Sequence, residues 1–150
     1  MSSEDSRFSR EFRALTGHDH FPWQLDLYRR FTEGDFPKAC NIPTGLGKTS
    51  VIPIWIISLA RALRGKQVAK IPRRLIYVVN SRTVVDQAPG EVVRMQDRLT
   101  GHAEGNRAER ETLVALGRSP LAGSARSDRD ASIAISTLRG EFAENGRDAV

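Results

Sequence analysis

The sequence "NIPTGLGKTSVIPIWIISLARAL", residues 41–63, places a glycine-rich turn directly before a long apolar segment. Gly45 and Gly47 permit backbone angles that other residues avoid, and they leave room for close approach to the main chain. The apolar residues that follow occupy nearly every side of a helix over residues 48–63, which predicts a helix buried on most faces. Pro53 lacks an amide hydrogen, so we expect a bend or a late start in this helix.

The glycine turn has the chemistry of a phosphate-binding loop. Its amide groups can surround phosphate oxygens, and the positive end of the following helix adds to the attraction. The strict pattern G-x-x-x-x-G-K-[ST] requires glycine where the chain has Ile42, so the match rests on the Gly-x-Gly-Lys-Thr core. A plain helix-capping loop is the alternative, but it gives the lysine no role. We therefore predict a nucleotide site formed by Thr44, Gly45, Leu46, Gly47, Lys48 and Thr49.

Two residues of this site have predicted catalytic roles. Lys48 would reach the β- and γ-phosphates, and the hydroxyl of Thr49 would bind Mg²⁺. The prediction requires residues 43–49 to lie between the carboxyl end of a sheet strand and the start of a helix.

Short apolar runs rich in β-branched residues predict strands around this loop. Residues 1–20 are polar, and we expect a loosely held leader with a short helix near residues 8–15. The expected strands are residues 38–42, 75–79 and 132–136, and the expected helices are residues 24–32, 48–63, 83–99 and 107–116. Strands that alternate with helices predict an α/β fold, with a parallel sheet and flanking helices.

Charge and composition favour a nucleic-acid partner and disfavour a membrane. The 150 residues carry a formal net charge of +5, which fits a polyanion, although an arginine-rich composition would give the same charge without one. No run of 18 apolar residues is present, and residues 1–13 contain no apolar signal core, so we expect a cytoplasmic chain with no membrane span. Cys40 is the only cysteine and is expected to pack as a small hydrophobe.

The loop P-T-G-x-G-K-T resembles that of superfamily 2 helicases, and other motifs of that family follow in order. Gln24, about twenty residues upstream, resembles the Q-motif glutamine whose amide reads the adenine edge. "NSRTVVDQ", residues 80–87, resembles motif Ia, and "STLRG", residues 136–140, resembles motif Ib. The resemblance implies ATP and Mg²⁺ as cofactors and single-stranded DNA as a partner, whose backbone would contact Arg82, Thr83, Gln87, Thr137 and Arg139.

Together these motifs look most like the helicase part of the CRISPR-associated helicase-nuclease of type I interference systems. The resemblance implies an incomplete RecA-like P-loop domain over residues 21–150, ATP-driven translocation on DNA in antiviral defence, and recruitment to a CRISPR surveillance complex. No apolar run ends in Asp-Glu, the pair that holds Mg²⁺ and orients the attacking water in this family. We therefore expect an N-terminal fragment that binds nucleotide weakly and neither hydrolyses ATP well nor unwinds DNA alone.

Two other interpretations stay open. One is a non-catalytic remnant that binds nucleic acid, and the other is a different P-loop NTPase. The lid arginines of a small kinase and the N-K-x-D motif of a GTPase are absent. "GHDH", residues 17–20, contains a His-Asp pair, but we interpret it as a coincidence and not as the metal site of a nuclease.

Overall fold

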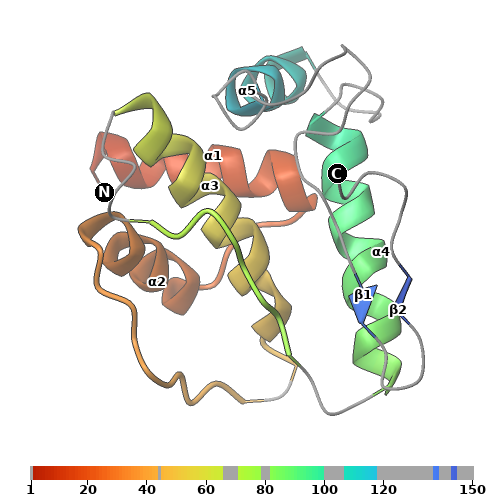
Figure 1. The fold of residues 1–150 in the computed structure, drawn as a ribbon. Coiled ribbons are helices and arrows are strands. Elements are labelled where there is room, and N and C mark those ends of the chain that lie inside the picture. Colours follow the sequence, from red (N-terminus) through yellow and green to blue (C-terminus); the bar gives the residue numbers. More distant parts are fainter. Residues whose placement is uncertain are drawn as a thin grey trace.

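The computed structural model of the chain is a cluster of packed helices (Figure 1). It describes residues 2–43, 45–65, 71–78, 82–99, 107–117, 137–138 and 143–144. The helices in this part are α1 (Ser3–Thr16), α2 (Pro22–Glu33), α3 (Val51–Arg64), α4 (Arg82–Leu99) and α5 (Arg107–Gly117), with the 3-10 turn η1 (Lys48–Ser50) directly before α3. The strands are β1 (Thr137–Leu138) and β2 (Ala143–Glu144), which pair antiparallel.

The predicted α/β fold, an incomplete RecA-like domain with a parallel sheet, is wrong. Within the described residues the sheet consists of β1 and β2 alone, with two residues in each strand. Residues 38–42 and 75–78 are irregular, and the predicted strand at 132–136 lies outside the described residues. The apolar surface of α3 is covered by other helices, so this part of the core forms without a sheet.

α1 lies inside the predicted polar leader and is longer than the helix expected there. It begins at a capping box, in which Ser2 Oγ accepts the Asp5 N–H at 3.1 Å and the Asp5 carboxylate accepts the Ser2 N–H at 2.8 Å. Phe8, Phe12 and Leu15 follow at helical spacing and are almost completely buried. α1 therefore supplies one wall of the core.

α3 is the central element of the core. Ten of its fourteen residues are buried, which confirms the prediction of a helix covered on most faces. α1 and α2 both pack against α3, and the rings of Phe8 and Tyr28 stack between α1 and α2 with centroids 4.3 Å apart.

Pro53 confirms the expected late start of this helix. The α-helical part begins only at Val51, after the tighter turn of η1. Pro53 falls in the first helical turn, where amide groups have no partner within the helix, so its missing hydrogen costs little there.

Two further sequence expectations concern a membrane span and Cys40. None of the helices in the described part combines the length and apolar content needed to span a bilayer. Cys40 is exposed, so the expectation that it packs as a small hydrophobe is wrong. It lies in the irregular segment between α2 and the glycine loop.

Candidate phosphate-binding site

The loop before α3 holds two glycines in left-handed backbone conformations. The angle φ is 89° at Gly45 and 70° at Gly47, a region that residues with a β-carbon rarely adopt. The carbonyl of Gly47 accepts the N–H of Ser50 at 2.9 Å and so closes the first turn of η1. A β-carbon on Gly47 would lie 3.1 Å from both Gln24 Nε2 and Ser50 Oγ, so space as well as φ requires glycine here.

The strand–loop–helix arrangement that the sequence prediction requires is not formed in the described residues, so the predicted strand-supported phosphate loop is wrong, and what remains is a glycine loop that leads into a helix. Residues 45–47 lead directly into η1 and α3, but residues 38–43 upstream form no strand. The helix end still offers free amide groups and a positive partial charge. Lys48 at this end is exposed, with no carboxylate partner in the described part of the chain, and Thr49 is partly buried. Thr44 lies outside the described residues.

The start of α2 lies against the glycine loop. The indole N–H of Trp23 donates to the main-chain oxygen of Leu46 at 3.1 Å. Gln24 is completely buried, and its Nε2 faces Gly47. The structure therefore places Gln24, predicted to belong to the nucleotide site, beside the loop that begins about twenty residues later. The hydrogen bond from Trp23 has no sequence signal, because its acceptor is a main-chain atom.

The side chain of Gln24 is only half satisfied. Its Oε1 accepts the N–H of Phe21 at 2.7 Å. Its Nε2 is buried and has no hydrogen-bond partner. A buried polar group without a partner costs about 1–3 kcal/mol, so such groups are rare in proteins. Gln24 is closed off from solvent in this structure with its Nε2 beside Gly47, and the adenine contact that the resemblance implies stays a prediction.

The predicted DNA-contacting residues belong to other elements. Arg82, Thr83 and Gln87 lie in the first two turns of α4, and the structure does not describe their side chains. Thr137 is the first residue of β1, and Arg139 lies outside the described residues.

Within the described part, no group of three or more His, Cys, Asp or Glu side chains could hold a metal ion. His20 Nε2 instead lies 2.8 Å from Ser9 Oγ, and its ring packs near Phe8 and Phe12. At the glycine loop the Thr49 hydroxyl is the side chain suited to Mg²⁺, so a bound ion would depend mainly on phosphate oxygens.

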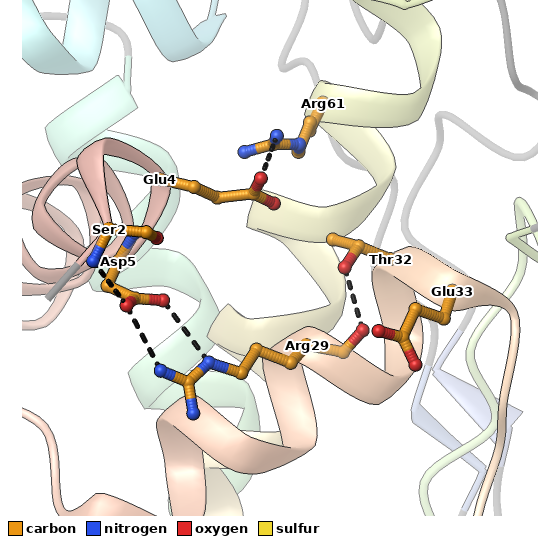
Figure 2. A pocket seen from close by; sticks show the side chains of 7 residues that line it. All are labelled: Ser2, Glu4, Asp5, Arg29, Thr32, Glu33 and Arg61. Carbon is orange, nitrogen blue, oxygen red and sulfur yellow. Dashed lines mark hydrogen bonds and ion pairs between the residues drawn. The ribbon is translucent and has the colours of Figure 1, made fainter.

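A polar pocket of about 410 Å³ lies among α1, α2 and α3 (Figure 2). Arg29 reaches from α2 to Asp5 on α1 with Nη2–Oδ2 and Nε–Oδ1 distances of 3.0 and 3.2 Å. Arg61 reaches from α3 to Glu4 with an Nη2–Oε2 distance of 2.7 Å. The pocket is lined by Ser2, Glu4, Asp5, Arg29, Thr32, Glu33 and Arg61, none of which stands out in the sequence as a candidate site.

The charges of this pocket explain one strong pKa shift. Hydrogen bonds from Arg29, followed by the bond from the Ser2 main chain, lower the pKa of Asp5 to about 2. Asp5 in turn raises the pKa of Arg29. Because both arginines already have carboxylate partners, we interpret the pocket as an ion-pair network that joins three helices.

Comparisons with models of protein families, with curated proteins and with solved structures find no match. Support for the candidate site therefore comes from the residues of this chain alone, namely the start of α2 and the loop at residues 45–49.

Proposed function

We propose that residues 45–49 bind the phosphate groups of a nucleoside triphosphate, with ATP as the nucleotide that the sequence motifs favour. The packing of α2 against the loop carries this proposal. Trp23 bonds to Leu46, and the unpartnered amide of Gln24 faces Gly47. This packing holds the loop at the positive end of a helix, where anions are stabilised.

The surroundings of the two glycines support a proposed side for phosphate binding. Apart from its chain neighbours, a β-carbon on Gly45 would meet no described residue within 4 Å, whereas the same atom on Gly47 would meet Gln24 and Ser50. Among the described residues, the Gly45 side of the loop is therefore open, and the Gly47 side is closed by α2 and by Ser50 of η1. A phosphate on the open side would meet main-chain N–H groups and the Lys48 ammonium group.

In this proposal Thr49 helps to bind the Mg²⁺ ion that accompanies the nucleotide. With nucleotide bound, Mg²⁺ would neutralise phosphate charge, and the Thr49 hydroxyl would supply one of its oxygen ligands. No Asp-Glu pair follows an apolar run in the 150 residues, so we propose binding without efficient hydrolysis.

The resemblance extends the proposal to a role in an ATP-dependent single-stranded DNA helicase of CRISPR interference. Its support is the order of the motifs along the sequence, from Gln24 through Lys48 to the segments at 82–87 and 137–139. Because the described residues form no parallel sheet, a RecA-like mechanism is not part of the proposal. DNA translocation and recruitment to a surveillance complex rest on the sequence motifs alone.

Titration of the chain with a fluorescent ATP analogue and Mg²⁺ tests the phosphate site. We expect Lys48→Ala to weaken binding by about tenfold, equivalent to about 1.4 kcal/mol. Lys38→Ala is the matched control, because Lys38 is also exposed and lies upstream in an irregular segment. Equal affinity in wild type and Lys48→Ala, or no saturable binding in the wild type, would contradict the proposal. Circular dichroism of each variant checks that the helices are retained.

A further inference from the structure

Residues 71–78 run back along α3 without pairing to a strand (Figure 1). At the start of this segment, Ile71 is buried in an apolar cluster on α3, and the indole N–H of Trp55 donates to the Pro72 oxygen at 2.8 Å. Towards its end, Tyr77 packs against the main core. The segment is therefore held in place at two points.

The outward side of this segment is apolar and uncovered. Ile76 is 85% exposed and Val78 is 84% exposed, whereas Tyr77 between them is partly buried. This alternation is the period of an extended chain, in which residues two apart share a side, so Arg74 lies on the same side as Ile76 and Val78. Within the described part of the chain, the main-chain groups of residues 74–78 make no hydrogen bond with other main-chain groups.

An extended segment with free main-chain groups and alternating side chains is suited to strand addition. We propose that residues 74–78, the docking segment, bind an extended stretch of a partner protein in which a carboxylate flanks two aliphatic residues at alternate positions. Main-chain pairing supplies affinity. Aliphatic side chains opposite Ile76 and Val78 and a carboxylate opposite Arg74 supply specificity.

Charge selects an acidic partner over a second copy of the chain. Arg73 and Arg74 are exposed and have no carboxylate partner in the part that the structure describes, and residues 71–78 contain no Asp or Glu. In a parallel pair of two copies the arginines would face each other. In an antiparallel pair centred on Ile76, each Arg74 would lie opposite Val78. A partner strand with a carboxylate opposite Arg74 avoids both the repulsion between two arginines and the pairing of a charged side chain with an aliphatic one.

The docking segment is also already positioned for binding. Because Ile71 and Tyr77 hold it against the helices, a partner strand would not have to order it, which removes part of the entropic cost of association. An uncovered extended segment with unpaired main-chain groups, like an exposed edge strand, is otherwise a site of nonspecific association, which proteins usually cover or charge.

A capped peptide with the sequence Glu-Thr-Val-Thr-Val-Thr-Glu is the probe. It carries a carboxylate at each end, so it satisfies the proposal in either strand direction. Isothermal titration of the full chain should show saturable binding. A peptide with the same side chains and N-methyl groups along one main-chain edge should bind at least tenfold more weakly, and so should a peptide with lysine in place of both glutamates.

Charge inversion tests the specific contact. We expect Arg74→Glu to lose affinity for the glutamate peptide and to gain affinity for the lysine peptide. Arg10→Glu is the matched control, because Arg10 is exposed on α1 and the change in net charge is identical. This control should leave both affinities within about twofold, and circular dichroism should show the same helix content in both variants.

Three results would overturn the proposal. The first is an absence of saturable binding by the glutamate peptide. The second is equal binding of the N-methylated peptide, or an equal effect of Arg74→Glu and Arg10→Glu, since either would reduce the interaction to general charge attraction. The third is a concentration-dependent dimer in sedimentation that Ile76→Lys dissociates, because a second copy would then cover the docking segment.

Discussion

The indole nitrogen of Trp23 and the main-chain oxygen of Leu46 lie 3.1 Å apart, so one hydrogen bond ties the start of α2 to the middle of the glycine loop. The loop has no strand before it that could hold it in position. Its position therefore depends on this bond and on the contact between Gln24 and Gly47. Order in the loop should depend on residues of α2 that touch no phosphate.

Trp23→Phe removes the donor and keeps an aromatic ring. We expect the affinity for a fluorescent ATP analogue to fall several-fold, and the free energy of unfolding to fall by about 1 kcal/mol, the net value of one hydrogen bond. Trp55→Phe is the matched control, because it removes a comparable bond to Pro72 away from the loop. Urea unfolding should show similar losses for both variants, and only Trp23→Phe should change affinity. Equal loss of affinity in both variants would show that the bond from Trp23 to Leu46 has no specific role in nucleotide binding.

Gly47→Ala should destabilise the chain more than Gly45→Ala. Both positions have positive φ, so each substitution costs about 1–2 kcal/mol in backbone strain. Only at Gly47 would the added β-carbon also press on Gln24 and Ser50. Chemical denaturation measures the difference in unfolding free energy. A larger loss for Gly45→Ala would show that space around Gly47 does not limit the loop.

Asp5 should make stability depend on pH in the acid range. Its pKa in the folded chain is about 2, below the ordinary value of 3.8, because Arg29 and Ser2 donate hydrogen bonds to it. A lowered pKa gives stability that is present above about pH 4 and is lost as the pH falls towards 2. We therefore expect Asp5→Asn to be less stable than wild type at pH 5, and this difference to shrink towards pH 2.

Urea unfolding at a series of pH values measures this effect of Asp5. Asp19→Asn is the control, because the Arg13–Asp19 pair is exposed on both sides and such pairs contribute little. A difference between wild type and Asp5→Asn that is constant from pH 5 to pH 2 would show that the pKa of Asp5 is not lowered by folding.

Tyr28 should make stability depend on pH in the alkaline range, where stability is lost as the pH rises. Burial raises the pKa of Tyr28 to about 12, although the charge and hydrogen bond of Arg61 act against the shift. Folding thus favours the neutral phenol, and this stability is present below about pH 10 and is lost as the pH rises towards 12. The ultraviolet difference titration of wild type against Tyr28→Phe measures this ionisation. A transition in that difference near pH 10 would contradict the burial of the hydroxyl.

The helices could be predicted from sequence because their signals are local. α2, α3, α4 and α5 begin and end within a few residues of the predicted bounds, since apolar spacing and, for α2, α3 and α5, nearby Gly or Pro residues define them. The spacing of Phe8, Phe12 and Leu15 carried the same signal for α1, but the polar composition around them favoured a leader.

The sheet was predicted wrongly because strand pairing is not a local property. A short apolar run such as residues 75–79 fits a buried strand, but it does not show which neighbour will pair with it. In the structure helices cover α3, and residues 75–78 stay unpaired. At the candidate site, motif spacing predicted that Gln24 and the glycine loop belong to one nucleotide site. The bond from Trp23 to Leu46 could not be predicted, because every residue carries the same main-chain acceptor.

Pro53 has a consequence for the loop that precedes α3. If the α-helix grew backwards through residues 45–49, Pro53 would move into its interior, and the proline ring would collide with the carbonyl of Thr49 four positions earlier. Pro53 therefore prevents the glycine loop from becoming part of the α-helix. Insertions or deletions before residue 48 would change the length of that segment and leave the register of α3 against its neighbours untouched.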